Sequence, residues 1–275
     1  MPRELSNGIN LKGALQLSGN AGSSGQVLTS AGTGAVPTWA AAGGFTGGTL
    51  TSNLTVAAGT TSLSPLTFQS GTNLTTATAG AVEYDGKVIY ATPNATAGRG
   101  VSPSMLFYRL NSSLAGSNVN TAQSVFGVGV TLAASTVYAF DGFFTLQKTA
   151  GTTSHTISLL FGGTATLNNV GYWASSLRYT TANANEAATA QGIAVVVGYG
   201  TSTSATVYTG SITTTNSTFT IKIQGTVSVN AGGTFIPQYQ LSAAPGGAYS
   251  TLVGGSFAVW PVGASGANTS VGAWA

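Results

Sequence analysis

The sequence has no cysteine, one histidine and very few charged side chains. Its 275 residues include 8 Lys and Arg, 5 Asp and Glu and no Cys, so only 5% of the chain is charged. The lack of cysteine excludes a disulfide framework and thiolate metal ligands. A single histidine also leaves almost no basis for a zinc centre or for Cys–His catalysis. We therefore expect neither a metal nor a cofactor.

The few charges that exist are dispersed along the chain. An ordinary soluble domain carries about 25% charged residues, whereas here the 8 basic side chains are scattered and form no stripe that could neutralise phosphates. No apolar run approaches the roughly 18 residues of a membrane helix. The first residues also lack the apolar core of a signal peptide. We therefore expect no nucleic-acid partner and no membrane insertion.

Low charge does not make this chain disordered. Disorder is favoured by low hydrophobicity together with high net charge. Here 43% of the residues are hydrophobic, the mean hydropathy is +0.26 and the formal net charge is only +3. The composition predicts an ordered protein whose surface is hydrated by Ser, Thr, Asn and Gln, as suits a protein packed against copies of itself.

The first part of the chain differs in texture from the rest. Residues 1–64 are dense in Gly, Ala, Ser and Thr, and their apolar residues come in short groups such as Leu15 with Leu17 and Leu54 with Val56. Each group is too short to build a core, so we expect strands that take partners from other chains, separated by turns. A flexible linker is the alternative. We assign 1–64 to an extended attachment arm or stalk and 65–275 to a head.

The head contains segments in which large apolar residues alternate with polar ones. The alternation is clearest in residues 219–229 and 138–146, and it recurs in 155–161. Asp85-Gly86, which separates two further apolar segments, is a strong hairpin signal. Short strands with turns between them are typical of a sandwich or jelly roll. The sequence predicts an all-β protein, with the extended N-terminal arm followed by an antiparallel, jelly-roll-like β-sandwich.

Few residues could carry catalysis. Glu83 and Asp85 lie two apart and would share one face of a strand, as a carboxylate pair does. The hairpin turn explains Asp85 better, and Asp141 is expected to pair with a basic or backbone group. His155 shares a strand face with apolar residues, so we expect it to be structural. No nucleotide-binding glycine loop occurs between a strand and a helix. We expect no catalytic residue, and hence no enzyme.

Aromatic residues in polar surroundings are a second class of candidate. Tyr172, Trp173 and Tyr179 lie among Gly, Ser, Asn and Thr. Aromatic rings presented by loops can stack on sugars or anchor protein contacts. We take these three as candidate ligand-facing residues. The alternative is that they fill the core and the interfaces between subunits.

One segment of the arm has a specific pattern. Residues 25–39 read Gly-Gln-Val-Leu-Thr-Ser-Ala-Gly-Thr-Gly-Ala-Val-Pro-Thr-Trp. The segment resembles the G-Q-V-L-x-S-x-G-x-G-x-x-P-x-W signature of bacteriophage tail fibres and other virion structural proteins, especially those of marine and cyanobacterial phages. It covers about 15 residues. The pattern predicts a short strand, a glycine turn and an aromatic anchor; the candidate attachment and trimer contacts are Gln26, Val27, Leu28, Pro37 and Trp39.

The resemblance implies a structural protein on the surface of a phage particle, assembled in the host cytoplasm. Our leading hypothesis is a cement protein or short head fibre that decorates the capsid as a homotrimer and binds the major capsid protein or other virion proteins. A tail fibre normally needs a longer shaft than the arm provides. The alternative is a short tail fibre or receptor-binding protein whose head recognises a host-surface glycan. A glycan-degrading enzyme is disfavoured because only 5 acidic residues are present.

Overall fold

The chain consists of β-strands, turns and extended segments. The computed structural model describes residues 16–17, 19–41, 53–94, 96, 98–179, 194–200, 204–266 and 268–274. This part of the chain contains no helix, and therefore no helix long and apolar enough to cross a membrane. It forms two compact units, Met1–Leu66 and Thr67–Ala275. The expected all-β class is confirmed.

The described residues of the first unit include a β-hairpin. Strands β1 (Gln26–Thr29) and β2 (Thr38–Ala41) pair antiparallel, with Leu28 opposite Trp39. The predicted strand therefore exists, and it pairs within its own chain where we expected a partner from another chain. The reason is local: the glycine-rich segment between the two strands allows the chain to reverse.

The second unit begins with a small sheet of three strands, namely β3 (Val82–Tyr84), β4 (Ile89–Asn94) and β5 (Gly98–Ser102). The turn between β3 and β4 is the predicted Asp85-Gly86 hairpin. Gly86 has a φ of 91°, which glycine adopts without strain. The Asp85 carboxylate accepts hydrogen bonds from the amides of Lys87 and Val88, each at 2.8 Å. This aspartate is thus a turn residue.

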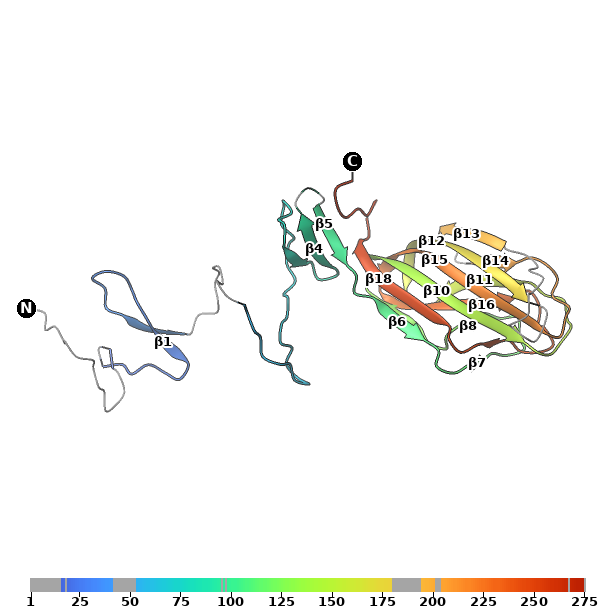
Figure 1. Ribbon diagram of the computed structural model, residues 1–275, viewed down its shortest axis with the longest axis horizontal. Helices are drawn as coiled ribbons and strands as arrows, with labels where there is room; N and C mark the ends of the chain where they lie inside the picture. Colours follow the sequence, from blue (N-terminus) through green and yellow to red (C-terminus); the bar gives the residue numbers. More distant parts are fainter. Residues whose placement is uncertain are drawn as a thin grey trace, which may run out of the picture. The chain divides into compact units, whose positions relative to one another are not determined.

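The larger part of the second unit is a sandwich of two antiparallel sheets (Figure 1). One sheet has the order β13–β12–β15–β10. On its other side β10 pairs with both β17 and β18; β17 in turn pairs with β7, and β18 pairs with β6. Its strands are β6 (Leu106–Arg109), β7 (Leu114–Ala115), β10 (Thr136–Lys148), β12 (Thr166–Tyr179), β13 (Ala194–Gly200), β15 (Ser217–Ala231), β17 (Ser250–Thr251) and β18 (Ser256–Ala264).

The second sheet has the order β14–β11–β16, and β16 pairs at its far edge with β8 and β9. Its strands are β8 (Gln123–Ser124), β9 (Val130–Leu132), β11 (Ile157–Gly162), β14 (Ala205–Tyr208) and β16 (Gly233–Leu241). The short strands β6, β7, β8 and β9 therefore lie at edges of the two sheets.

The core of the sandwich is built from aromatic rings. Side chains of a strand alternate between its two faces, and the inward residues of β10 and β15 are the ones that the alternation predicts, from Tyr138 to Leu146 and from Phe219 to Val229. Phe140 is fully buried, with its ring centroid 5.1 Å from that of Phe161 and 5.8 Å from that of Phe257. Phe161 also stacks on Phe235 at 4.5 Å. The two sheets are held together largely by these contacts.

Candidate functional surfaces

Residues 25–39, which resemble the virion-protein signature, are called the virion-like segment below. The hairpin of the first unit explains the residue types in this segment. Gly32 and Gly34, in the turn, have φ values of 97° and 80°, which favour glycine. The Gln26 side chain accepts a hydrogen bond from the Ser23 amide at 2.7 Å, which fixes the turn before β1. The segment therefore encodes a turn, a strand, a second turn and a second strand.

Trp39 is held against its own chain. Its indole nitrogen donates a hydrogen bond to the Asn20 carbonyl at 3.0 Å. Its ring lies so close to Gly22 that a Cβ on that glycine would be 2.8 Å from the ring. In contrast, Val27 and Leu28 are 47% and 45% exposed, and Pro37 is exposed as well. Val27, Leu28 and Pro37 are thus free to contact a partner, whereas Trp39 stabilises the hairpin.

The carboxylates of the head have structural partners. Glu83 pairs with Arg99 at 2.9 Å, and this arginine is the largest cause that lowers the pKa of the Glu83 carboxyl. Asp141 on β10 pairs with Lys222 on β15, as expected for a strand residue beside a basic one. In the described residues, no group of three His, Asp or Glu side chains could hold a metal ion.

His155 is buried at one end of the sandwich. Its ring nitrogens lie 2.7 Å from the Thr153 carbonyl oxygen and 2.9 Å from the Tyr249 hydroxyl. Burial lowers the pKa of this histidine, and the cationic side chains of Lys148 and Arg178 lower it further. Both cations are themselves buried and bonded to carbonyl or hydroxyl oxygens. The histidine is therefore structural, as expected.

The lowered pKa of His155 predicts acid sensitivity. Because the folded protein holds this ring neutral, the unfolded chain binds the additional proton first as the pH falls below 6.5. Stability contributed by the neutral ring is therefore present above pH 6.5 and decreases toward the lower pKa of the folded state, by at most about 1.4 kcal/mol per pH unit. Urea unfolding between pH 7.5 and 5 measures the slope. His155→Gln, which does not titrate, should flatten it; an equal slope in both proteins would contradict this assignment.

Only part of the predicted aromatic site faces solvent. All three residues lie on strand β12 rather than on a loop. Tyr172 is 3% exposed and points inward, with its ring 5.2 Å from that of Phe161, so its assignment as ligand-facing was wrong. Trp173 points outward and is 37% exposed. The side chain of Tyr179 lies outside the described residues. The sequence did not show the alternation of β12 because small residues such as Gly171 and Ala174 stand among its large ones.

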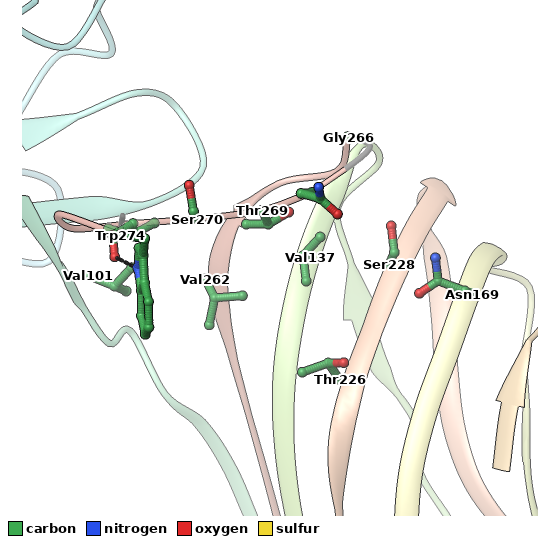
Figure 2. Close-up of a pocket in the computed structure, with 12 residues that line it drawn as sticks. Val101, Val137, Asn169, Thr226, Ser228, Val262, Gly266, Thr269, Ser270 and Trp274 are labelled. Carbon is green, nitrogen blue, oxygen red and sulfur yellow. Dashed lines mark hydrogen bonds between the residues drawn. The ribbon is translucent and has the colours of Figure 1, made fainter.

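A cavity of about 590 Å³ lies on the outer face of the larger sheet. Figure 2 shows its floor, where Asn169, Ser228 and Val137 stand side by side on β12, β15 and β10. Gly266 and residues of the segment 268–274 form the wall. On this wall Trp274 is 80% exposed, and its indole nitrogen donates to the Val271 carbonyl at 2.7 Å. The lining contains hydroxyl, amide and apolar groups but no charged side chain. It could bind an uncharged ligand rich in hydroxyl groups.

A second cavity, of about 320 Å³, lies at the edge where the two sheets meet. We call it the edge groove. Its exposed members are Leu106, Phe107, Tyr108 and Val128, which are 49%, 62%, 41% and 46% exposed, and the adjoining Met105 is 54% exposed. The sequence contained a signal for this surface that we missed, because three large apolar residues in succession on one edge strand, with Met105 directly before them, are unusual unless they bind something.

Comparison with known proteins gives no relative. No protein-family model matches the chain, and no curated protein matches it. A structure of infectious bursal disease virus, Gx strain, is 10% identical over 71% of this chain and 49% of that chain, with a TM-score of 0.16. The crystal structure of an infectious bursal disease virus VP2 subviral particle is 11% identical over 70% and 48%, with a TM-score of 0.12. The chain spans about half the length of these solved chains, and the TM-scores define no common fold.

Proposed function

We propose that this chain is a structural protein of a bacteriophage particle, a cement protein or short head fibre that decorates the capsid surface as a homotrimer. The observation that carries the proposal is the hairpin formed by residues 20–41. It contains the complete virion-like segment, and it lies in a unit separate from the sandwich. Its exposed Val27 and Leu28 are available to the major capsid protein or to another virion protein.

The state of the carboxylates supports a structural role over an enzymatic one. Glycoside hydrolysis needs two carboxyl groups on opposite sides of a sugar. In the described residues, Glu83 and Asp141 are each paired with a cation, and Asp85 accepts hydrogen bonds from two amides and from Tyr90. These acids fix turns and strands, so we assign no catalytic residue.

The trimer is the first part of the proposal to test. The large apolar residues described in the first unit, such as Val27, Leu28 and Leu54, are largely exposed, so contacts with other chains would bury them. Native mass spectrometry of the full chain at micromolar concentration should give a species of three times 27.2 kDa. A protein that remains monomeric would contradict the trimer.

A short tail fibre or receptor-binding protein is the second candidate. The outer-face cavity favours it, because hydroxyl and amide groups beside an exposed indole suit an uncharged sugar. Under this alternative the sandwich presents the cavity to a glycan on the host surface.

The glycan-binding alternative predicts a specific loss of affinity. If a panel of neutral oligosaccharides contains a ligand, Trp274→Ala should weaken its binding about two- to tenfold, since a stacked aromatic ring contributes roughly 0.5–1.5 kcal/mol. Trp274→Phe should retain most of the affinity because it keeps a ring. Titration calorimetry measures both, with Trp173→Ala as a control outside the cavity. Unchanged binding in Trp274→Ala would exclude this cavity as the glycan site.

A further inference from the structure

The edge groove lies beside a strand that has one open side. β6 pairs only with β18 in the described part of the chain. The Leu110 amide, just after β6, bonds to the Gly255 carbonyl next to β18 at 2.8 Å. Because main-chain groups alternate along an antiparallel strand, the amide and carbonyl of Phe107 point away from β18. The open side therefore offers main-chain hydrogen bonds beside an apolar surface.

Such an edge is a hazard unless something covers it. Natural sheets protect their edges with lysine, proline, bulges or a covering segment. In the described part of the chain, Leu106, Phe107 and Tyr108 of β6 have none of these and are exposed; the charged residue of the strand, Arg109, lies at its end. None of the described residues that line the groove is charged. Its occupant must therefore be extended, uncharged and apolar on one side.

The chain contains a segment that fits these requirements. Residues 53–58 read Asn-Leu-Thr-Val-Ala-Ala, with no charge and no proline. Leu54 and Val56 are 69% and 44% exposed, and they are two residues apart, so both would lie on one face of an added strand. In the described residues, 53–58 belongs to no strand and makes no main-chain hydrogen bond. A groove of about 320 Å³ is large enough for two such side chains, since a 150 Å³ cavity holds a benzene ring.

The occupant of the groove could be residues 53–58 or the edge groove of a second copy. The symmetry of the trimer decides between the two. Two copies can pair through the same patch, but a closed ring of three needs two unlike surfaces, one on each side of every subunit. The exposed large apolar residues include two such sets, those of the arm and those of the edge groove. The argument from symmetry rests on the homotrimer of the proposed function.

We infer that residues 53–58 of one copy add as a strand to β6 of a neighbouring copy, with Leu54 and Val56 filling the edge groove. Two kinds of interaction would stabilise the contact, as in other cases of strand addition: main-chain hydrogen bonds at the open edge and burial of apolar side chains. It would tie each subunit to the next around the trimer and protect the edge from aggregation.

Cysteine cross-linking tests this contact directly, because the chain has no cysteine of its own. One population carries Val56→Cys and is labelled with ¹⁵N; the other carries Val128→Cys and is unlabelled. After mixing and refolding, a short bismaleimide should join labelled to unlabelled chains. A chain carrying both cysteines reports cross-links within one copy. Phe107→Glu should dissociate the trimer, whereas Phe143→Glu should not, because Phe143 is an exposed phenylalanine on the outer sheet face, away from the groove.

The outcomes separate failure of this contact from failure of the trimer. Joined labelled and unlabelled chains together with a trimer mass support the inference. Links only within one chain, or only between two Val128→Cys chains, overturn it. If the protein is a trimer but gives no cross-link, or if the trimer persists in Phe107→Glu, the inferred contact is wrong although the protein is still a trimer. A monomer mass for the unsubstituted chain would contradict both the trimer and the inferred contact. Circular dichroism confirms that each variant remains folded.

Discussion

A chain that begins at Pro65 is expected to fold and to lose its binding to particles. The second unit, Thr67–Ala275, contains the entire sandwich and its aromatic core, so removing the preceding residues deletes none of the buried contacts. The arm is different. Leu54, Val56 and Leu63 are 69%, 44% and 70% exposed, so the arm gains little from burial, while ordering costs about 1–2 kcal/mol per residue.

Add-back to particles that lack the protein measures this effect. The full chain should bind, and the truncated chain should remain in the supernatant while keeping the β-type circular dichroism spectrum of its head. Trp39→Ala should weaken attachment by less, because it removes the bond to the Asn20 carbonyl and the contact with Gly22 but leaves the paired strands. If the truncated head bound as well as the full chain, attachment would reside in the head.

Phe140→Ala is expected to destabilise the head severely. Phe140 is fully buried, and its ring touches those of Phe161, Phe235 and Phe257, which belong to both sheets. Removing a buried phenylalanine ring costs about 3–5 kcal/mol, compared with about 5–15 kcal/mol for the total stability of a typical protein. Denaturant unfolding should show the midpoint shift.

A neighbouring phenylalanine provides the matched control. Phe143 lies three residues further along β10, on the opposite face, and is 45% exposed. Phe143→Ala should change the free energy of unfolding by about 0.5 kcal/mol or less, as is usual for surface substitutions. Similar losses for the two variants would mean that the inward and outward faces of β10 have been assigned incorrectly.

The long strands of the core were predictable because their alternation is unbroken. In β15, apolar residues occupy the odd-numbered positions from 219 to 229 with only Gly225 between them, and β10 repeats the pattern from 138 to 146. Burial of one face selects for such a pattern. The hairpin turn at Asp85 was predictable for a similar reason, since few residues other than glycine accept the backbone angles that Gly86 adopts.

The surfaces were harder to predict because they depend on which strands become edges. Leu106, Phe107 and Tyr108 read as a buried strand, and only the sheet order shows that β6 pairs on one side. Trp274 gave no periodic signal because the segment that carries it belongs to no strand. Tyr172 and Trp173 are adjacent in sequence, and the register of β12 alone decides which of them is buried.

The location and number of copies on the particle test the central claim most directly. Electron micrographs of phage particles labelled with an antibody to the head, combined with quantitative mass spectrometry of the same particles, give both. A capsid-decorating protein predicts label over the whole shell and tens to hundreds of copies per particle. Label confined to the tail would contradict capsid decoration, and particles that carry no copies would contradict the virion assignment itself.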